Sequence, residues 1–364
     1  EVEKATPAHP FEDKPLAVKE EKKGGASGIS ASAYEYQEPM VTTLAGSGNP
    51  GFADGPGAEA SFKQPAGIVL DGSGNIYVAD SENHRIRKIT PAGVVTTLAG
   101  SGEAGFADGT GIKAVFNGPA GIAIDRDGNI YTPEWKGHRV RKITPEGVVT
   151  TLAGSGKAGF ADGIGTEASF NTPGGVALDS KGNVYVADSA NNKIRKISPN
   201  GVVTTLAGSG KGGLVDGARA EASFWWPIGI ALDAIGNIYV GDMRNHCIRK
   251  IIPSGVVTTL AGSGKSGNGD GAGAEASFNY PFGPAVDAMG NIYVADAGNN
   301  RIRKITPSGV VSTIAGTGKA GSEDGYGSAA SFITPWGVAL DGFGAVYVSD
   351  HRSNKIRKIY QSGY

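Results

Sequence analysis

Short apolar runs separated by polar turns fill most of the chain beyond residue 40. In the first full copy of this pattern, the run at 75–79 is apolar on both faces, as in a strand that is covered on each side. The run at 94–99 is rich in valine and threonine, which favour strands, and the turn before it contains Pro91 and Gly93. No helical period competes. The pattern predicts four short strands, at residues 67–70, 75–79, 85–89 and 94–99.

The same four runs recur every 54 residues, without insertion or deletion. A tyrosine marks the second run of each copy, namely Tyr77, Tyr131, Tyr185, Tyr239, Tyr293 and Tyr347. Four short antiparallel strands per repeat, joined by short turns, are typical of a propeller blade. The sequence therefore predicts an all-β fold, a six-bladed β-propeller with four-stranded antiparallel blades.

The two ends of the repeat region are offset in a way that predicts ring closure. Residues 41–45 match the fourth strand of the repeat, whereas the sixth copy stops after its third strand at Ile359. We expect the N-terminal strand to complete the last blade, which removes an exposed sheet edge. The predicted propeller spans residues 40–364. Residues 1–39, rich in Lys, Glu and Pro, are expected to form a flexible tail or tether, or else a segment that orders on a partner.

The composition supports this fold and excludes several kinds of partner. The chain has 59 glycines and 39% hydrophobic residues, which fits many turns around a normal core. A net charge of −1 gives no attraction to nucleic acid. Arg and Lys are adjacent in each third strand, as in Arg87 and Lys88, so they point to opposite faces, and we expect salt-bridged blade packing. The chain contains no run of 18 apolar residues, which is the length needed to span a membrane.

Both the single cysteine and the first residue of the chain bear on its chemistry and location. One cysteine, Cys247, excludes an intramolecular disulfide framework and a Cys-based zinc cluster, and we expect it to be buried. The alternative for Cys247 is a reactive thiol. The chain starts at Glu1 rather than Met, which suggests a removed leader and an exported protein, in the extracellular space, the periplasm or at the cell surface.

Three motifs in the repeat resemble the NHL family. They are Pro-x-Gly-(Ile/Val)-Ala-x-Asp, then Asn-Ile-Tyr-Val-Ala-Asp, and then Asn-His-Arg-Ile at 83–86, where Asn83 and His84 match the pair that names the family. The resemblance covers about residues 41–359, and the Gly-Phe-Ala-Asp-Gly insertion resembles the bacterial extracellular branch. It implies a six-bladed propeller but no chemistry, because this architecture hosts lyases, RNA binders, sensor domains and interaction modules.

Carboxylates that recur in every copy are expected to build the blade. We expect the acidic residue that ends each second strand to cap its own turn, by accepting backbone N–H groups near Asn83 or its equivalents. These residues are Asp80, Glu134, Asp188, Asp242, Asp296 and Asp350. Calcium is an alternative at 125–129, which looks like a calcium loop but lacks the downstream acidic ligand. We predict no cofactor.

An enzymatic function is the competing hypothesis. The amidating lyases that share this repeat carry metal-binding histidines at the central channel. Here His84, His138 and His246 lie in equivalent loops of different blades, so one zinc ion cannot collect all three. No Gly-x-Ser-x-Gly motif is present. The alternative is a metal-dependent hydrolase or lyase with its site in the axial channel, lactonase-like or amidating-lyase-like.

Positions where the copies disagree are the most informative, because every blade makes the same demands on its framework. Two loops on one face hold all four tryptophans: the connection into the first strand, and the turn between the second and third strands. Clustered aromatics are typical of a recognition patch, although they could instead form a lid over the channel. We predict a non-catalytic binding or scaffold propeller for a protein, peptide or glycan. Its candidate binding residues are Trp135, Trp225, Trp226, Ile228, Tyr280, Phe282 and Trp336.

Overall fold

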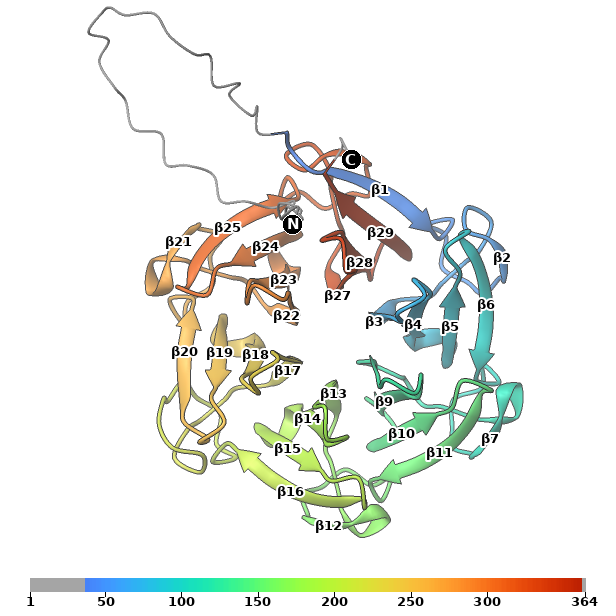
Figure 1. Cartoon of the computed structure of the whole chain (residues 1–364), viewed down its shortest axis with the longest axis vertical. Coiled ribbons are helices and arrows are strands. Elements are labelled where there is room, and N and C mark those ends of the chain that lie inside the picture. The colour runs from blue at the N-terminus through green and yellow to red at the C-terminus, as the bar shows by residue number, and fades with distance from the viewer. Residues whose placement is uncertain (1–36, 362–364) are drawn as a thin grey trace, which may run out of the picture.

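Six antiparallel sheets surround a central axis in the computed structural model, which describes residues 37–361 (Figure 1). Counted outward from the axis, blade 1 contains β3 (Pro65–Leu70), β4 (Ile76–Asp80), β5 (Arg85–Ile89) and β6 (Val94–Ala99). Blade 2 has β8 (Ala123–Ile124), β9 (Ile130–Glu134), β10 (Arg139–Ile143) and β11 (Val148–Ala153); blade 3 has β13 (Pro173–Leu178), β14 (Val184–Asp188), β15 (Lys193–Ile197) and β16 (Val202–Ala207). Blade 4 has β17 (Pro227–Leu232), β18 (Ile238–Asp242), β19 (Cys247–Ile251) and β20 (Val257–Ala261); blade 5 has β22 (Pro281–Val286), β23 (Ile292–Asp296), β24 (Arg301–Ile305) and β25 (Val310–Ala315). Blade 6 has β27 (Pro335–Leu340), β28 (Val346–Asp350), β29 (Lys355–Tyr360) and β1 (Met40–Ala45).

Five blades carry a fifth, two-residue strand on their outer edge, which the repeat pattern did not predict. It comes from the long connection between blades and pairs with the start of the fourth strand, as Gly55 and Pro56 do with Val95 and Val94. These strands are β2 (Gly55–Pro56), β7 (Gly109–Thr110), β12 (Gly163–Ile164), β21 (Gly271–Ala272) and β26 (Gly325–Tyr326). Short 3₁₀ turns complete the described part of the chain: η1 (Ser81–Asn83), η2 (Gly111–Lys113), η3 (Gly165–Glu167), η4 (Ser189–Asn191), η5 (Met243–Asn245), η6 (Gly273–Glu275) and η7 (Ala297–Asn299).

The N-terminal strand closes the ring, as predicted. β1 lies between β29 and β26 in the sheet of blade 6, and Met40 faces Tyr360 in an antiparallel pair (Figure 1). Of the expected tail, residues 37–39 are placed against this blade: the amide of Gly327 donates to the Pro39 carbonyl at 2.7 Å. The Ser328 hydroxyl donates to the Glu38 carboxylate at 2.6 Å. The rest of the tail prediction, residues 1–36, lies outside the described residues.

The hydrophobic core is divided among the boundaries between neighbouring blades, which we call seams. One such cluster joins Phe62 and Val78 of blade 1 to Ala339 and Tyr347 of blade 6. A fully buried phenylalanine from the long connection is present in every blade: Phe62, Phe116, Phe170, Phe224, Phe278 and Phe332. Each blade therefore depends on its neighbour for the burial that stabilises it, as expected for a repeat fold.

A fully buried arginine ties each blade together internally. Arg87 binds Asp80 at 2.7 Å and Asp54 at 2.6 Å, and it also donates to two backbone carbonyls. The equivalent arginines are Arg141, Arg195, Arg249, Arg303 and Arg357. The predicted salt-bridged packing is confirmed. The expected capping bond is wrong in detail, because Asp80 accepts from the Lys63 amide and the Asn83 side chain rather than from backbone amides near Asn83.

The innermost strands approach one another through a ring of glycines. The amide of Gly67 donates to the Ala120 carbonyl at 2.8 Å, and a Cβ at Gly67 would lie 2.6 Å from that oxygen. Only glycine allows this approach. The equivalent positions are Gly121, Gly175, Gly229, Gly283 and Gly337.

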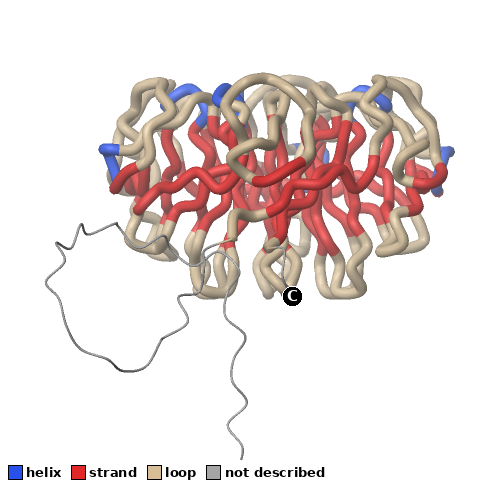
Figure 2. The backbone as a smooth tube through the Cα atoms, turned by 90° about the horizontal axis from the view of Figure 1, so that it is seen from above, coloured by secondary structure: helices blue, strands red, loops and turns tan. Residues whose placement is uncertain are grey.

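The ring has two distinct faces, visible edge-on in Figure 2. The face that bears the loops between second and third strands is called the upper face. The opposite, lower face bears the hairpin turns between first and second strands and between third and fourth strands. Within residues 37–361, no helix has the length and apolar character needed to cross a bilayer.

Candidate functional site

Aromatic rings from four blades meet on the upper face. The Trp135 ring centroid lies 6.4 Å from that of Trp226 and 5.8 Å from that of Trp336. Trp336 also contacts Phe282 at 4.6 Å and His351 at 5.0 Å. We call these five residues the aromatic cluster.

The position of the aromatic cluster follows from which blades supply it. Trp135 belongs to blade 2, Trp226 precedes the first strand of blade 4, and Trp336 lies in the first strand of blade 6. None of these blades adjoins another of the three, so their side chains can touch only across the ring axis. The aromatic cluster therefore covers the upper opening of the axis, which is the arrangement that the lid alternative expects.

The other candidate binding residues divide into one buried and two exposed side chains. Ile228 is buried in β17. Trp225 is 45% exposed and Tyr280 is 44% exposed, so both rings are open to solvent. Arg244 stacks on Trp226 at 4.9 Å and reaches Trp225 at 6.0 Å. The upper face thus combines a half-buried aromatic cluster with two exposed aromatic side chains and a cation.

The backbone that presents these aromatics is held in a strained conformation. Trp226 and Tyr280 have φ of 58° and 52° and stand directly before a proline, although bulky residues avoid left-handed backbone and residues before proline favour extended backbone. In each blade the amide of this residue donates to a side chain of the preceding blade. Trp226 donates to Asn192 Oδ1 at 2.8 Å, and Tyr280 donates to His246 Nδ1 at 3.2 Å.

These bonds form a complete set of six, which we call the seam bonds. The remaining donor and acceptor pairs are Gly118 with His84, Thr172 with His138, Thr334 with Asn300 and Gln64 with Asn354. Sequence reasoning treated the Asn-His pair only as a family motif and missed this role. The signal was present, because the acceptor position is only ever His or Asn, and both types tolerate left-handed backbone.

His351 contributes an uncharged ring to the aromatic cluster. Its Nδ1 lies 3.0 Å from the Pro65 carbonyl oxygen, so this nitrogen carries the hydrogen and donates. Burial lowers the pKa of His351 to about 4, although the bond to Pro65 favours the charged form. The ring is neutral at neutral pH, which fits an apolar recognition surface better than a general acid or base.

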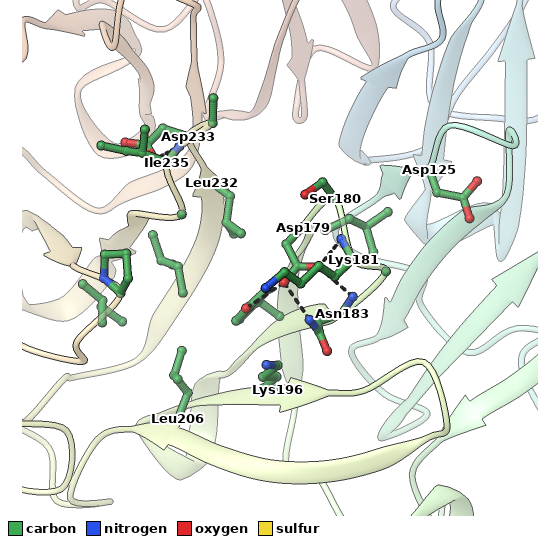
Figure 3. Close-up of a pocket in the computed structure, with 18 of the residues that line it drawn as sticks. Asp125, Asp179, Ser180, Lys181, Asn183, Lys196, Leu206, Leu232, Asp233 and Ile235 are labelled. Atoms are coloured by element: carbon green, nitrogen blue, oxygen red, sulfur yellow. Dashed lines mark hydrogen bonds between the residues drawn. The ribbon is translucent and has the colours of Figure 1, made fainter.

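A cavity of about 1100 Å³ opens on the lower face (Figure 3). It is lined by the first turns of blades 2, 3 and 4 and continues between blades 3 and 4. Its central carboxylate, Asp179, accepts from Asn183, Tyr185 and the Lys181 amide at 2.7–3.1 Å. Burial raises the pKa of Asp179, but these bonds outweigh burial and lower it overall. The carboxylate is therefore ionised and already engaged in its own turn.

The described residues offer no ready metal centre. No group of three or more His, Cys, Asp or Glu side chains within 37–361 could hold a metal ion. In the loop considered for calcium, the Asp125 carboxylate accepts from Asn129 and Tyr131. Cys247 is buried, and burial raises the pKa of its thiol well above the ordinary value, which disfavours a reactive thiolate.

Comparison with known proteins places the chain among repeat propellers. A family profile described as "NHL repeat" matches residues 62–89, 170–197, 224–251 and 278–305. Protein SUPPRESSOR OF QUENCHING 1 of Arabidopsis thaliana, a chloroplastic protein, is 33% identical over 281 residues, which cover 72% of this chain and 27% of that protein. The NHL repeat-containing protein 2 of Gallus gallus is 33% identical over 71% of this chain and 41% of its own length. The chain thus spans well under half the length of these curated relatives.

The fold also recurs among solved structures. An auxiliary nutrient binding protein from Bacteroides thetaiotaomicron superposes with a TM-score of 0.69 at 19% identity, over 92% of this chain and 79% of that one. At this identity the likeness shows the fold alone. The six-fold repeat, the closed ring of blades and the four matched repeats together show that the chain is a six-bladed β-propeller that contains NHL repeats.

Proposed function

We propose that this propeller is a non-catalytic binding module whose upper face recognises a protein, peptide or glycan. The observation that carries the proposal is the exposed pair Trp225 and Tyr280 beside the half-buried aromatic cluster. Large aromatic side chains supply much of the binding energy at recognition surfaces, and truncating one commonly costs about 2 kcal/mol or more. An exported location and a tethering role for residues 1–39 belong to the same proposal.

The asymmetry of the face supports recognition of an asymmetric partner. Blades 1 and 3 have Gln64 and Thr172 where blades 4 and 5 have Trp226 and Tyr280. All of these residues adopt the same backbone conformation and make the same seam bond. The framework therefore does not require an aromatic side chain at this position, and its presence in blades 4 and 5 needs a separate reason.

A metal-dependent hydrolase or lyase in the axial channel is the alternative function. Such an enzyme needs a nucleophile or a set of metal ligands that are available to substrate. The polar groups at the lower cavity that we would assign to this role, such as Asp179 and Asp125, are occupied by bonds within their own turns. Because these carboxylates are already hydrogen-bonded within their own turns, the binding proposal is favoured over catalysis.

The test compares binding by matched surface variants. The full chain would be screened on glycan and peptide arrays, and the affinity for each ligand found would be measured by titration calorimetry. Trp225→Ala and Tyr280→Ala together should weaken binding at least tenfold, which corresponds to about 1.4 kcal/mol. Both side chains are exposed, so the melting temperature should stay within about 2 °C of wild type.

Phe160→Ala is the matched control, because Phe160 is a similarly exposed aromatic from the outer connection of blade 3. It should leave the affinity unchanged. Trp336→Ala is a less direct variant, because it also removes contacts with Trp135 and Phe282. Equal affinities of wild type and the Trp225/Tyr280 variant would contradict the proposal and would mean that the ligand binds to another surface.

A further inference from the structure

The six seam bonds divide into two chemical kinds. In blades 3, 5 and 6 the acceptor is an amide oxygen, supplied by Asn192, Asn300 and Asn354. In blades 1, 2 and 4 the acceptor is a ring nitrogen, supplied by His84, His138 and His246. The geometry is otherwise uniform, because all six acceptor residues have φ between 51° and 56°. Five of the bonds span 34 residues, and the sixth joins Gln64 to Asn354 across the closure of the ring.

The two kinds respond differently to acid. An amide oxygen does not titrate, so an asparagine seam bond is the same at every physiological pH. A histidine Nδ1 accepts a hydrogen bond only while it lacks a proton, and both ring nitrogens of a charged imidazole are donors. Protonation therefore turns a seam bond into a contact between two donors.

We propose that the ring carries three acid-sensitive seams, between blades 1 and 2, 2 and 3, and 4 and 5, and three acid-insensitive seams between the others. Acidification would release the seam-bond donors Gly118, Thr172 and Tyr280 of blades 2, 3 and 5, while the three asparagine seams hold. This inference concerns the ring itself and does not depend on the binding function proposed above.

The local structure makes release favourable once the bond is lost. Thr172 has a left-handed φ of 53°, although it is β-branched and precedes Pro173, and each of these two features disfavours left-handed backbone. Tyr280 has the same geometry, and its ring packs on His246 at 4.9 Å. The seam bond holds each residue in this conformation, so its loss frees the chain to relax.

The charged groups around each histidine affect the pH at which its seam bond is lost. His84 faces Glu82 and Arg85 of its own loop, Lys63 from the preceding connection and Lys136 from blade 2. Glu82 is paired with Lys136 at 2.8 Å, so its charge is largely balanced.

The other two histidines have fewer charged neighbours. His138 has Arg139 beside it, while His246 has the Tyr280 ring against it. Burial is the largest effect at all three sites, and it lowers the pKa of His84, His138 and His246 below the ordinary value.

The direction of the pH effect follows from this lowering. As the pH falls below about 6.5, the unfolded chain binds protons that the folded ring does not, so folding stability decreases. The stabilisation is complete above that pH and is lost progressively towards the lower pKa of the folded state. Buried carboxylates act in the opposite direction: burial raises the pKa of Asp242 and of Asp350 to about 6. The test must therefore compare variants that share these carboxylates.

The chain itself supplies the matched substitution. His84→Asn, His138→Asn and His246→Asn install the residue type that already forms the other three seam bonds. Melting temperatures of wild type and this triple variant would be measured at about pH 7.5 and about pH 5, on either side of the ordinary histidine pKa. We expect wild type to lose several degrees more than the triple variant. Asn192→His and Asn300→His should increase the loss.

Hydrogen exchange on wild-type protein gives a second, seam-by-seam reading. Protection of the amides of Gly118, Thr172 and Tyr280 should fall about 2- to 10-fold on acidification, as expected for the loss of one hydrogen bond. Protection of Gln64, Trp226 and Thr334 should stay constant. Equal behaviour of the two amide sets would overturn the proposal, even if the triple variant failed to fold. An equal pH dependence of wild type and triple variant would also overturn it.

Discussion

Glu134 occupies the position that an aspartate holds in the five other blades, and Gly137 stands where blade 1 has Asn83. In blade 1 the Asn83 amide donates to Asp80 at 2.8 Å. In blade 2 the extra methylene of Glu134 extends into this space, and its Oε2 is buried without a hydrogen-bond partner among the described residues. A Cβ at Gly137 would lie 2.7 Å from that oxygen. The two substitutions are therefore coupled.

We expect this coupling to appear in a double-mutant cycle. Glu134→Asp alone leaves a void, and Gly137→Asn alone clashes with the carboxylate, so each should lower the free energy of unfolding by about 1–3 kcal/mol. The double variant restores the pair of blade 1 and should recover about 0.5–3 kcal/mol relative to the sum of the singles. Denaturant unfolding gives the free energy of unfolding of wild type, the two single variants and the double variant. If the losses of the single variants simply add in the double variant, the two positions are not coupled.

Single residues also mark the limit of what the sequence predicts. The repeat showed that position 84 and its equivalents are His or Asn, but their hydrogen-bond donors lie in the next blade, 34 residues further on or, for Asn354, back at Gln64. That pairing depends on how blades stand side by side, which periodicity does not encode. Trp135 shows the same limit, since its contacts with Trp226 and Trp336 exist only because the ring closes.

Elements were more predictable than contacts. The third and fourth strands of blade 1 have the predicted bounds, and the first strand begins two residues earlier, at Pro65. Alternating burial and turn residues determine such strands locally. The outer two-residue strands were missed because a pair of residues such as Gly55 and Pro56 carries no periodic signal and pairs only through the curvature of the long connection.

The strand that closes the ring provides a test at this scale. Deleting residues 1–45 removes β1, with the fully buried Val41 and Ala45, and leaves β29 as an unpaired edge. We expect a large fall in melting temperature, of roughly 10 °C or more if several kcal/mol are lost. Thermal unfolding followed by circular dichroism measures it.

Deleting only residues 1–36 is the control, because the contacts of Glu38 and Pro39 with blade 6 remain. This truncation should melt like the full chain. A synthetic peptide of residues 37–46 added to the longer truncation should restore part of the lost stability. Identical melting of both truncations would mean that closure by β1 contributes nothing.

The whole molecule is uneven on its lower face. The third residue of the turn between first and second strands is polar in blades 1 to 3, where it is Ser73, Asp127 and Lys181. In blades 4 to 6 it is Ile235, Met289 and Phe343, which are 77%, 55% and 90% exposed. With a net charge of only −1, little repulsion opposes contact between molecules through these three side chains.

We therefore expect charge at these turns to improve solubility without affecting the fold. Met289→Lys and Phe343→Lys should reduce light scattering of concentrated protein near neutral pH, because they replace exposed apolar surface with charge. The amides of both residues, not their side chains, bond the turn aspartates, so the melting temperature should not change. Ser73→Lys adds a lysine at the equivalent turn without removing apolar surface. If Ser73→Lys reduces light scattering as much per added lysine as the other two substitutions do, the exposed apolar side chains of these turns do not cause the association.

The closure of the ring by β1 also determines how the protein responds to a pulling force. Met40 faces Tyr360 at one end of the strand pair, so tension between residues 37 and 361 acts on that pair first. The two strands would then peel apart one pair after another, at low force. A pull on residue 37 along the axis of β1 and away from the strand, towards the lower face, loads every pair together in shear. The ring is therefore weak when its two ends are drawn apart and strong when one end carries load against the whole propeller.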